Sequence, residues 1–270
     1  MSAARLAGLP PLVWINLDAE TGRRARMEAA FGAWGVRHAK RFSAIPGERA
    51  SAMIEGAAPA DKSANYLGCM LSHLSVVTDW AAEGAGELLM VMEDDCQLDL
   101  ARHWPFDWAD FLARAPYNFD ALQLSLINPR IMNFRLHRRH LYDWSLCAYV
   151  VTRPYAEKLA RLHRVGDRFR LDNLPYGRAS VEDMMLESGA TYSMPIFTYR
   201  VEEESSLDRD HIDALHRPCD DLYRRFWAER SARVTDWDAM FTPFAAFDAN
   251  AAEAGLYIGL PKEARFLGER

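Results

Sequence analysis

The chain has few cysteines, and none of them forms a paired motif. Cys69, Cys96, Cys147 and Cys219 are scattered over 270 residues without a C-x-x-C pair, and the eight histidines form no H-E-x-x-H pattern. Zinc sites and disulfide frameworks are normally visible in such spacings. We therefore expect four free thiols in a reducing compartment and no zinc site.

Long hydrophobic runs and an excess of basic residues are also missing. The longest apolar runs are short, such as 88–92, whereas a membrane-spanning helix needs about 20 apolar residues. The N-terminus lacks the basic start and apolar stretch of a secretory signal. With 32 Lys and Arg against 38 Asp and Glu, the formal net charge is -6, which argues against nucleic acid as a partner. These absences predict a soluble, cytoplasmic protein without a transmembrane segment.

The composition is that of an enzyme-sized globular protein. Half of the residues are apolar and 26% are charged, so the chain can bury a sizeable core. No internal repeat, low-complexity run or linker divides it. We expect one domain spanning residues 1–270.

Apolar runs of strand length alternate with helical patterns along the chain, which predicts an α/β fold with a sheet flanked by helices, parallel at least in its first half. Residues 48–63 are rich in Ala, Gly and Pro and are expected to form a mobile loop. The expected strands lie at 12–17, 41–47, 88–92, 121–126, 147–152 and 192–199, and the expected helices at 21–34, 65–83, after the N-cap Thr152 to about 163, and from 180.

Three acids follow one of these strands directly. Glu93, Asp94 and Asp95 come after the apolar run that ends at Met92, and ligands of α/β sheets bind at the carboxyl ends of strands. Alternation along an extended chain puts Glu93 and Asp95 on one side and Asp94 on the other. Two carboxylates on one side suit Mg²⁺ or Mn²⁺. A solvated acidic turn is the alternative interpretation.

Several motifs around the triplet occur in a characteristic order. They are Ile15-Asn-Leu-Asp18, Arg41-Phe-Ser-Ala-Ile-Pro-Gly47, Gly68-Cys-Met-Leu-Ser-His73, Met92-Glu-Asp-Asp95 and Ala148-Tyr-Val-Val-Thr152. Together they resemble glycosyltransferase family 25, which includes lipopolysaccharide, lipooligosaccharide and collagen galactosyltransferases. The resemblance covers residues 12–205 and leaves 206–270 as a C-terminal extension. It implies a GT-A-like, nucleotide-sugar-binding sheet.

The resemblance also implies an activity. This would be metal-dependent, inverting transfer of a hexose, galactose or glucose, from a UDP-sugar to a hydroxyl of a glycan or glycoconjugate acceptor, in lipopolysaccharide or other surface-polysaccharide biosynthesis. Asp95, helped by Glu93, would hold Mn²⁺ or Mg²⁺. The residues expected at the donor are Asn16, Asp18, Arg24, Arg26, His73, Glu93 and Asp94.

Some of these residues have simpler interpretations. Arg24 and Arg26 could be solvated on an exposed helix face, and His73 could be a buried histidine bonded to the sheet. His211 could be a further metal ligand or an exposed loop residue.

The catalytic base is expected just before the last predicted strand. Inversion by direct displacement needs a group that takes the acceptor's proton, and Asp183 is the first candidate, with Glu182 as the second. Ser180 and Asp183 also match a helix-capping pattern, which needs no catalysis.

A basic run at 135–140 stands out on this acidic chain. It could bind a phosphorylated acceptor or an anionic membrane surface, which leaves room for peripheral contact with the inner face of the membrane. A solvated loop is the simpler interpretation.

Two other classes of function remain open. A different metal-dependent phosphate enzyme could use the same acids, although such an enzyme is expected to have Asp-x-Asp after its first strand, and Asn16-Leu-Asp18 does not supply it. A non-catalytic sugar-binding or scaffold protein of the same fold is the other.

Overall fold

The structure is a computed structural model of the whole chain. It describes residues 3–83, 86–128, 131–172, 180–201, 212–231, 237–241 and 257–259. No helix in these segments is both long enough and apolar enough to cross a membrane.

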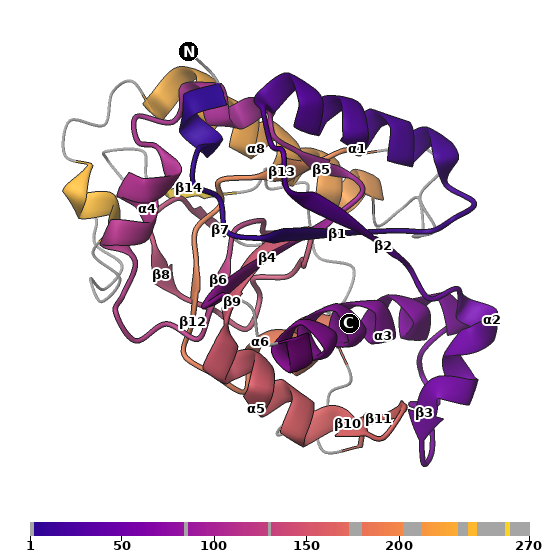
Figure 1. Ribbon diagram of the computed structural model, residues 1–270. Coiled ribbons are helices and arrows are strands. Elements are labelled where there is room, and N and C mark those ends of the chain that lie inside the picture. Colours follow the sequence, from indigo (N-terminus) through magenta and orange to yellow (C-terminus); the bar gives the residue numbers. More distant parts are fainter. Residues whose placement is uncertain are drawn as a thin grey trace.

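A seven-stranded sheet forms the centre of the described part of the chain (Figure 1). Its strand order is β2-β1-β4-β9-β6-β12-β8. The strands are β1 (Leu12–Asn16), β2 (Ala39–Ser43), β4 (Leu88–Glu93), β6 (Ala121–Gln123), β8 (His137–Arg138), β9 (Ala148–Thr152) and β12 (Thr191–Ser193). Shorter pairings outside this sheet involve β3 (Ile54–Glu55), β5 (Cys96–Gln97), β7 (Ile131–Asn133), β10 (Arg164–Val165), β11 (Arg168–Arg170), β13 (Thr198–Tyr199) and β14 (Tyr257–Gly259).

The first half of the sheet is parallel, as the alternating pattern predicts. Strand β1 pairs in parallel with both β2 and β4, so the carboxyl ends of three strands meet at one edge. Strand β9 then runs antiparallel between β4 and β6, and β12 pairs in parallel with β6. The α/β class is therefore confirmed, with a mixed second half.

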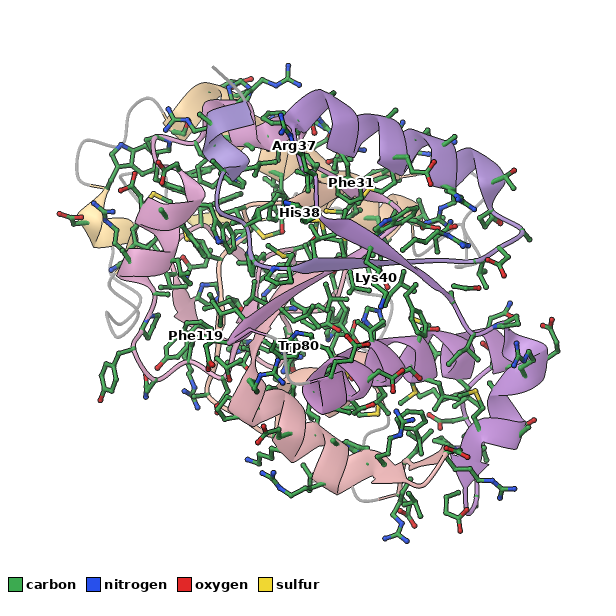
Figure 2. All side chains as sticks on the ribbon, in the orientation of Figure 1. Phe31, Arg37, His38, Lys40, Trp80 and Phe119 are labelled. Atoms are coloured by element: carbon green, nitrogen blue, oxygen red, sulfur yellow. The ribbon has the colours of Figure 1, made fainter. Side chains whose placement is uncertain are left out.

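Helices cover both faces of the sheet (Figure 1). They are α1 (Thr21–Trp34), α2 (Gly47–Ala50), α3 (Ala64–Glu83), α4 (Trp108–Arg114), α5 (Arg153–His163), α6 (Val181–Leu186) and α8 (Arg217–Arg225). Helix α1 lies on one face and carries Phe31 (Figure 2). Phe31 packs edge-on against Trp14 of β1. Helices α3 and α5 lie on the other face and pack on Val91 of β4.

Local signals place the ends of these helices where the sequence predicts them. Helix α1 ends at Gly35, which takes a left-handed conformation (φ 70°) that glycine adopts without steric cost. Helix α5 begins after Thr152, whose side chain accepts a hydrogen bond from the backbone N–H of Tyr155, and it has a proline in its first turn.

Other expectations need correction. Residues 48–63 are not a continuous loop, because they include most of α2, a 3-10 turn and β3. The single strand expected at 192–199 is two strands in different sheets, β12 and β13. Pro195 lies between them and has no N–H for a ladder. The single-domain assignment stays a prediction.

Candidate functional site

The acid triplet follows β4 at the carboxyl edge of the parallel half of the sheet. Along β4, Val91 belongs to the core on the α3 side and Met92 to the core on the α1 side. Continued alternation turns Glu93 toward α3 and Asp94 toward α1. The turn after the strand then carries Asp95. Asp94 and Asp95 share Arg23 and a cavity, whereas Glu93 faces α3, so the expectation that Glu93 and Asp95 lie on one side and Asp94 on the other is wrong.

Asp94 is held between β1 and α1. Its carboxylate accepts a hydrogen bond of 2.6 Å from the Asn16 side-chain amide and contacts Arg23 at 2.7 Å. Burial raises the pKa of Asp94, although Arg23 and Asn16 act against that shift. On the other side of Asn16, Arg41 donates to the amide oxygen at 2.9 Å. Asn16 is 2% exposed, so its side chain bridges the ends of three strands instead of facing an open cavity.

Arg23 of α1 contacts the acid triplet. It is not among the residues that the sequence predicts at the site. It lies one turn before Met27, which is buried, so both face the sheet. Arg24 lies on the exposed side of α1, where it pairs with Glu28 at 2.9 Å. Arg26 is exposed but lines a cavity together with Asp94 and Asp95.

Asp95 is the acid with an uncommitted oxygen. Its side chain is 24% exposed, and its Oδ1 atom is buried without a hydrogen-bond partner in the described structure. Burial, followed by the charge of Glu93, raises the pKa of Asp95 to about 7. The Arg23 guanidinium, at 3.8 Å, opposes that shift. A cation beside Asp95 would have the same effect as Arg23 and favour the ionised carboxylate.

Two cavities adjoin this edge of the sheet. The one beside the triplet has a volume of about 270 Å³, and its polar lining includes Arg26, Asp94, Asp95 and Arg200. The second, of about 690 Å³, lies at the ends of β1 and β2. Asp18 lines the second cavity, and Arg41 lowers the pKa of Asp18 by hydrogen bonding to its exposed carboxylate.

Glu93 faces two side chains of α3. Its Oε1 lies 3.1 Å from His73 Nε2 and 3.8 Å from the Cys69 sulfur. Burial would raise the pKa of Glu93, but His73, Arg23 and Cys69 together outweigh burial and hold that pKa below its ordinary value. His73 has no exposed surface and its other ring nitrogen lies 3.0 Å from the Tyr149 hydroxyl. His73 is thus a buried histidine joined to the sheet, as the simpler interpretation has it.

Glu182 and Asp183 begin α6 but have different surroundings. Asp183 is 6% exposed and lies 3.7 Å from the guanidinium of Arg139, while its backbone N–H donates to the capping Ser180. Glu182 is half-buried. It accepts a hydrogen bond of 3.1 Å from the backbone N–H of Ser145. Its charge also contributes to the raised pKa of Cys69, after burial and Glu93.

Ser145 is a residue that sequence patterns did not indicate. Its φ is +94°, an unusual backbone conformation for a residue with a side chain. This conformation accompanies the N–H contact to Glu182, and the Ser145 hydroxyl accepts a hydrogen bond from the backbone of Cys147. No local motif marks such a position, because a serine gives no sign of a left-handed conformation.

Part of the basic run at 135–140 is internal, which corrects the expectation of a solvated loop; Arg138 and His140 are exposed, and their contact with an acceptor or a membrane surface stays a prediction. Arg135 is 6% exposed, and His137 lies 3.0 Å from the buried Asp143. Arg138 stacks on Tyr192, and the Arg139 side chain is 3% exposed between Asp183 and Glu187. His211 lies outside the described residues.

Among known proteins, similarity to this chain is found in solved structures and not in family profiles or curated sequences. No protein-family profile and no curated protein sequence matches this chain. Two solved structures, the apo form and another form of the glycosyltransferase GlyE of Streptococcus pneumoniae TIGR4, are similar at 10% identity and a TM-score of 0.36. The matches cover 93% and 94% of this chain and 65% of the length of GlyE. With so low a TM-score, the similarity carries no argument about activity.

Proposed function

We propose that the chain is a glycosyltransferase that moves a hexose, galactose or glucose, from a UDP-sugar to a hydroxyl of a glycan or glycoconjugate. The observation that carries this proposal is the position of Asp95. It follows β4 at the carboxyl edge of the parallel strands, beside a cavity, with a buried oxygen that has no hydrogen-bond partner among the residues that the structure describes. Ligands of α/β sheets bind at such edges. The ordered family-25 motifs support the same class of enzyme.

The carboxylate oxygens at the carboxyl edge of the sheet suit Mn²⁺ or Mg²⁺, the divalent ions expected for an enzyme that uses a nucleotide sugar. Asp95 and Glu93 would hold Mn²⁺ or Mg²⁺, and the ion would supply charge neutralisation for the diphosphate leaving group. The raised pKa of Asp95 and its unpartnered oxygen fit this role, because an adjacent cation stabilises the ionised carboxylate. Arg26, in the same cavity lining, adds positive charge on the same side.

Of the two acids at the start of α6, we assign the role of base to Glu182. Asp183 is buried and is taken up as a partner of the buried Arg139. Glu182 is half-buried, and a backbone N–H fixes one of its oxygens. Its other oxygen can accept the proton of an acceptor hydroxyl while that hydroxyl attacks the anomeric carbon from the face opposite the leaving group.

The direct test is binding of nucleotide sugars with metal. UDP-galactose and UDP-glucose, each with Mn²⁺ or Mg²⁺, are added to the whole protein, and thermal unfolding and slow release of UDP are measured. A ligand that binds only the native state raises the melting temperature. Asp95→Asn is expected to abolish both effects, whereas Glu157→Gln, at an exposed residue of α5 that lines neither cavity, preserves them.

The same experiment separates the alternatives. The absence of stabilisation by any UDP-sugar with either ion would overturn the transferase proposal. Hydrolysis of p-nitrophenyl phosphate without any effect of UDP-sugars would instead favour another metal-dependent phosphate enzyme. Stabilisation by UDP-sugars with neither hydrolysis nor transfer would favour a non-catalytic sugar-binding protein. Lipooligosaccharide as the acceptor would connect the activity to surface-polysaccharide synthesis on the cytoplasmic side of the membrane.

A further inference from the structure

Three side chains that differ in chemistry converge beside the triplet. The ligand atoms of Cys69, His73 and Glu93 all lie within 4.8 Å of one another. His73 Nε2 and Glu93 Oε1 are 3.1 Å apart, and the Cys69 sulfur is 3.8 Å from the same oxygen. Ligands of a tetrahedral zinc ion, with bonds of about 2.0–2.3 Å, are separated by about 3.3–3.8 Å. Two of the three separations are close to this range, whereas the Cys69 sulfur and the His73 nitrogen, which lie within 4.8 Å, would have to approach each other by up to about an ångström.

The fold places these groups together for identifiable reasons. Cys69 and His73 are four residues apart on α3 and so lie on the same face of the helix. Glu93 is the β4 residue that alternation turns toward that helix. Gly68 allows α3 to approach the backbone at Ile45 closely, because a Cβ at this position would collide with the backbone oxygen of Ile45. The Ser72 hydroxyl then bonds to the backbone N–H of Ile45 at 2.8 Å and fixes the helix there.

The surroundings of His73 are those of a metal ligand. Its Nδ1 is 3.0 Å from the hydroxyl of Tyr149, and the ring is fully buried. A hydrogen bond at one ring nitrogen fixes the tautomer and the orientation of the other, which is the usual arrangement of a histidine bound to a metal. Here the remaining nitrogen, Nε2, points to Glu93 and Cys69.

Access and charge also favour an ion at this position. Cys69 is half-buried and the side chain of Glu93 is 29% exposed, so the cluster is reachable from outside. Glu93 brings a carboxylate to the cluster, and a bound cation would offset its negative charge. Three protein ligands would leave a fourth position for water, as in zinc sites that keep an open coordination position.

We propose that Cys69, His73 and Glu93 bind one divalent ion of the zinc class. Sulfur and imidazole ligands select zinc, cobalt or iron over Mg²⁺ or Mn²⁺, so this site differs in chemistry from the all-oxygen site at Asp95, with which it shares Glu93. On binding, the Cys69 thiol releases its proton to solvent and the sulfur forms the bond to the metal. The proposal does not depend on the transferase function, because it concerns metal binding in the absence of nucleotide.

Cobalt is the probe that reports on the sulfur ligand. Co²⁺ is titrated into the whole, metal-free protein without nucleotide, and the near-ultraviolet absorption of cobalt–thiolate charge transfer is recorded. One equivalent is expected to bind and to be displaced by Zn²⁺. Cys69→Ser is expected to remove the band. Cys219→Ser, at a buried cysteine whose sulfur contacts the backbone oxygen of Asn128, is expected to retain it.

A second variant keeps the test decisive if Cys69→Ser does not fold. Tyr149→Phe removes only the hydroxyl beside His73 Nδ1, and loss of such a partner typically weakens metal affinity 10- to 100-fold. The cobalt band is therefore expected at saturation but with weaker binding, in a protein of unchanged circular dichroism. Unchanged affinity in Tyr149→Phe would overturn the proposal.

Other results would also count against the site. A wild-type protein without the charge-transfer band would show that the cluster is only hydrogen-bonded. A band lost in Cys219→Ser and kept in Cys69→Ser would place the metal elsewhere. If UDP-sugars fail to bind while the cobalt band behaves as expected, the transferase proposal fails and the metal site stands.

Discussion

Asn16 at the end of β1 donates a hydrogen bond of 2.6 Å to Asp94 at the end of β4. Because Arg41 of β2 donates to the oxygen of the same amide, one buried side chain joins three adjacent strands beneath the acid triplet. A carboxylate could not both donate to Asp94 and accept from Arg41, whereas an amide does both. The geometry of the triplet therefore depends on an asparagine at this position.

Replacement of Asn16 by alanine is expected to destabilise the protein. It removes a hydrogen bond to a charged group and leaves Asp94 less well solvated, a loss of about 1.5–3 kcal/mol. Urea unfolding measures the change in the free energy of unfolding. Asn118→Ala is the matched control, because Asn118 is exposed and forms only a 3.3 Å bond to Tyr192. Equal effects in both variants would show that the Asn16 bridge contributes nothing special.

Glycine-to-alanine substitutions in two helices are expected to act in opposite directions. At Gly32 of α1, an added Cβ meets nothing within 4 Å, so the substitution should stabilise the protein by about 0.5–1 kcal/mol. At Gly68 of α3, it collides with the backbone of Ile45, and overpacking of this kind costs about 1–3 kcal/mol. Denaturation midpoints of the two variants test this. Stabilisation at both positions would mean that α3 can move away from Ile45.

Parts of the fold could be predicted because their signals are local. Gly35 ends α1, and Thr152 with Pro154 begins α5, since each acts on the backbone within one turn of its own position. Strand direction has no such local signal. The apolar run 148–152 is compatible with either direction, and only pairing with β4 and β6 makes β9 antiparallel.

In the candidate site, too, local sequence signals predict some features and not others. The apolar run of β4 placed the triplet at a strand end, and alternation gave opposite sides to Glu93 and Asp94. The side chains that contact the triplet come from distant segments of the chain. Arg23, not Arg24, is on the same side of α1 as the buried Met27, and this spacing could have identified it. The spacing of cysteines and histidines does not reveal the cluster of Cys69, His73 and Glu93, because Glu93 comes from a different segment of the chain.

Glu182 and Asp183 are expected to affect different properties. Glu182→Gln keeps an oxygen for the N–H of Ser145 but cannot take a proton, so kcat should fall about 10²- to 10⁴-fold with an unchanged melting temperature. Asp183→Asn deprives the buried Arg139 of a charged partner, so it should lower stability by about 1–3 kcal/mol and change kcat little. UDP-sugar turnover and thermal unfolding of both variants decide between the two acids; the reverse pattern would assign the base to Asp183.

The conformation of Ser145 gives a prediction about the same carboxylate. Glycine adopts a φ of +94° readily, so Ser145→Gly should keep the N–H contact to Glu182 and most of the activity. A β-branched side chain is strained in this conformation, so Ser145→Val should lower both stability and kcat. Activity and urea unfolding of the pair measure this. A Ser145→Val protein as active as Ser145→Gly would show that the contact does not position Glu182.

The pair of His137 and Asp143 should make stability depend on pH. Burial lowers the pKa of His137, but the Asp143 carboxylate at 3.0 Å outweighs burial and raises it above the ordinary value. Burial likewise opposes ionisation of Asp143, yet His137 and hydrogen bonds hold its pKa below the ordinary value. A histidine with a raised pKa in the folded state contributes stability below its unfolded pKa of about 6.5, and this contribution disappears as the pH rises through the folded pKa.

His137→Asn should therefore destabilise the protein most between about pH 5 and 6.5, where both partners are charged. Loss of a hydrogen bond to a charged group there costs about 1.5–3 kcal/mol, and the difference from wild type should shrink toward pH 9. Chemical denaturation at pH 5.5, 7 and 9 measures it. His38→Asn, at an exposed histidine before β2, controls for the loss of an imidazole. A difference that is constant across this range would mean that His137 stays neutral beside Asp143.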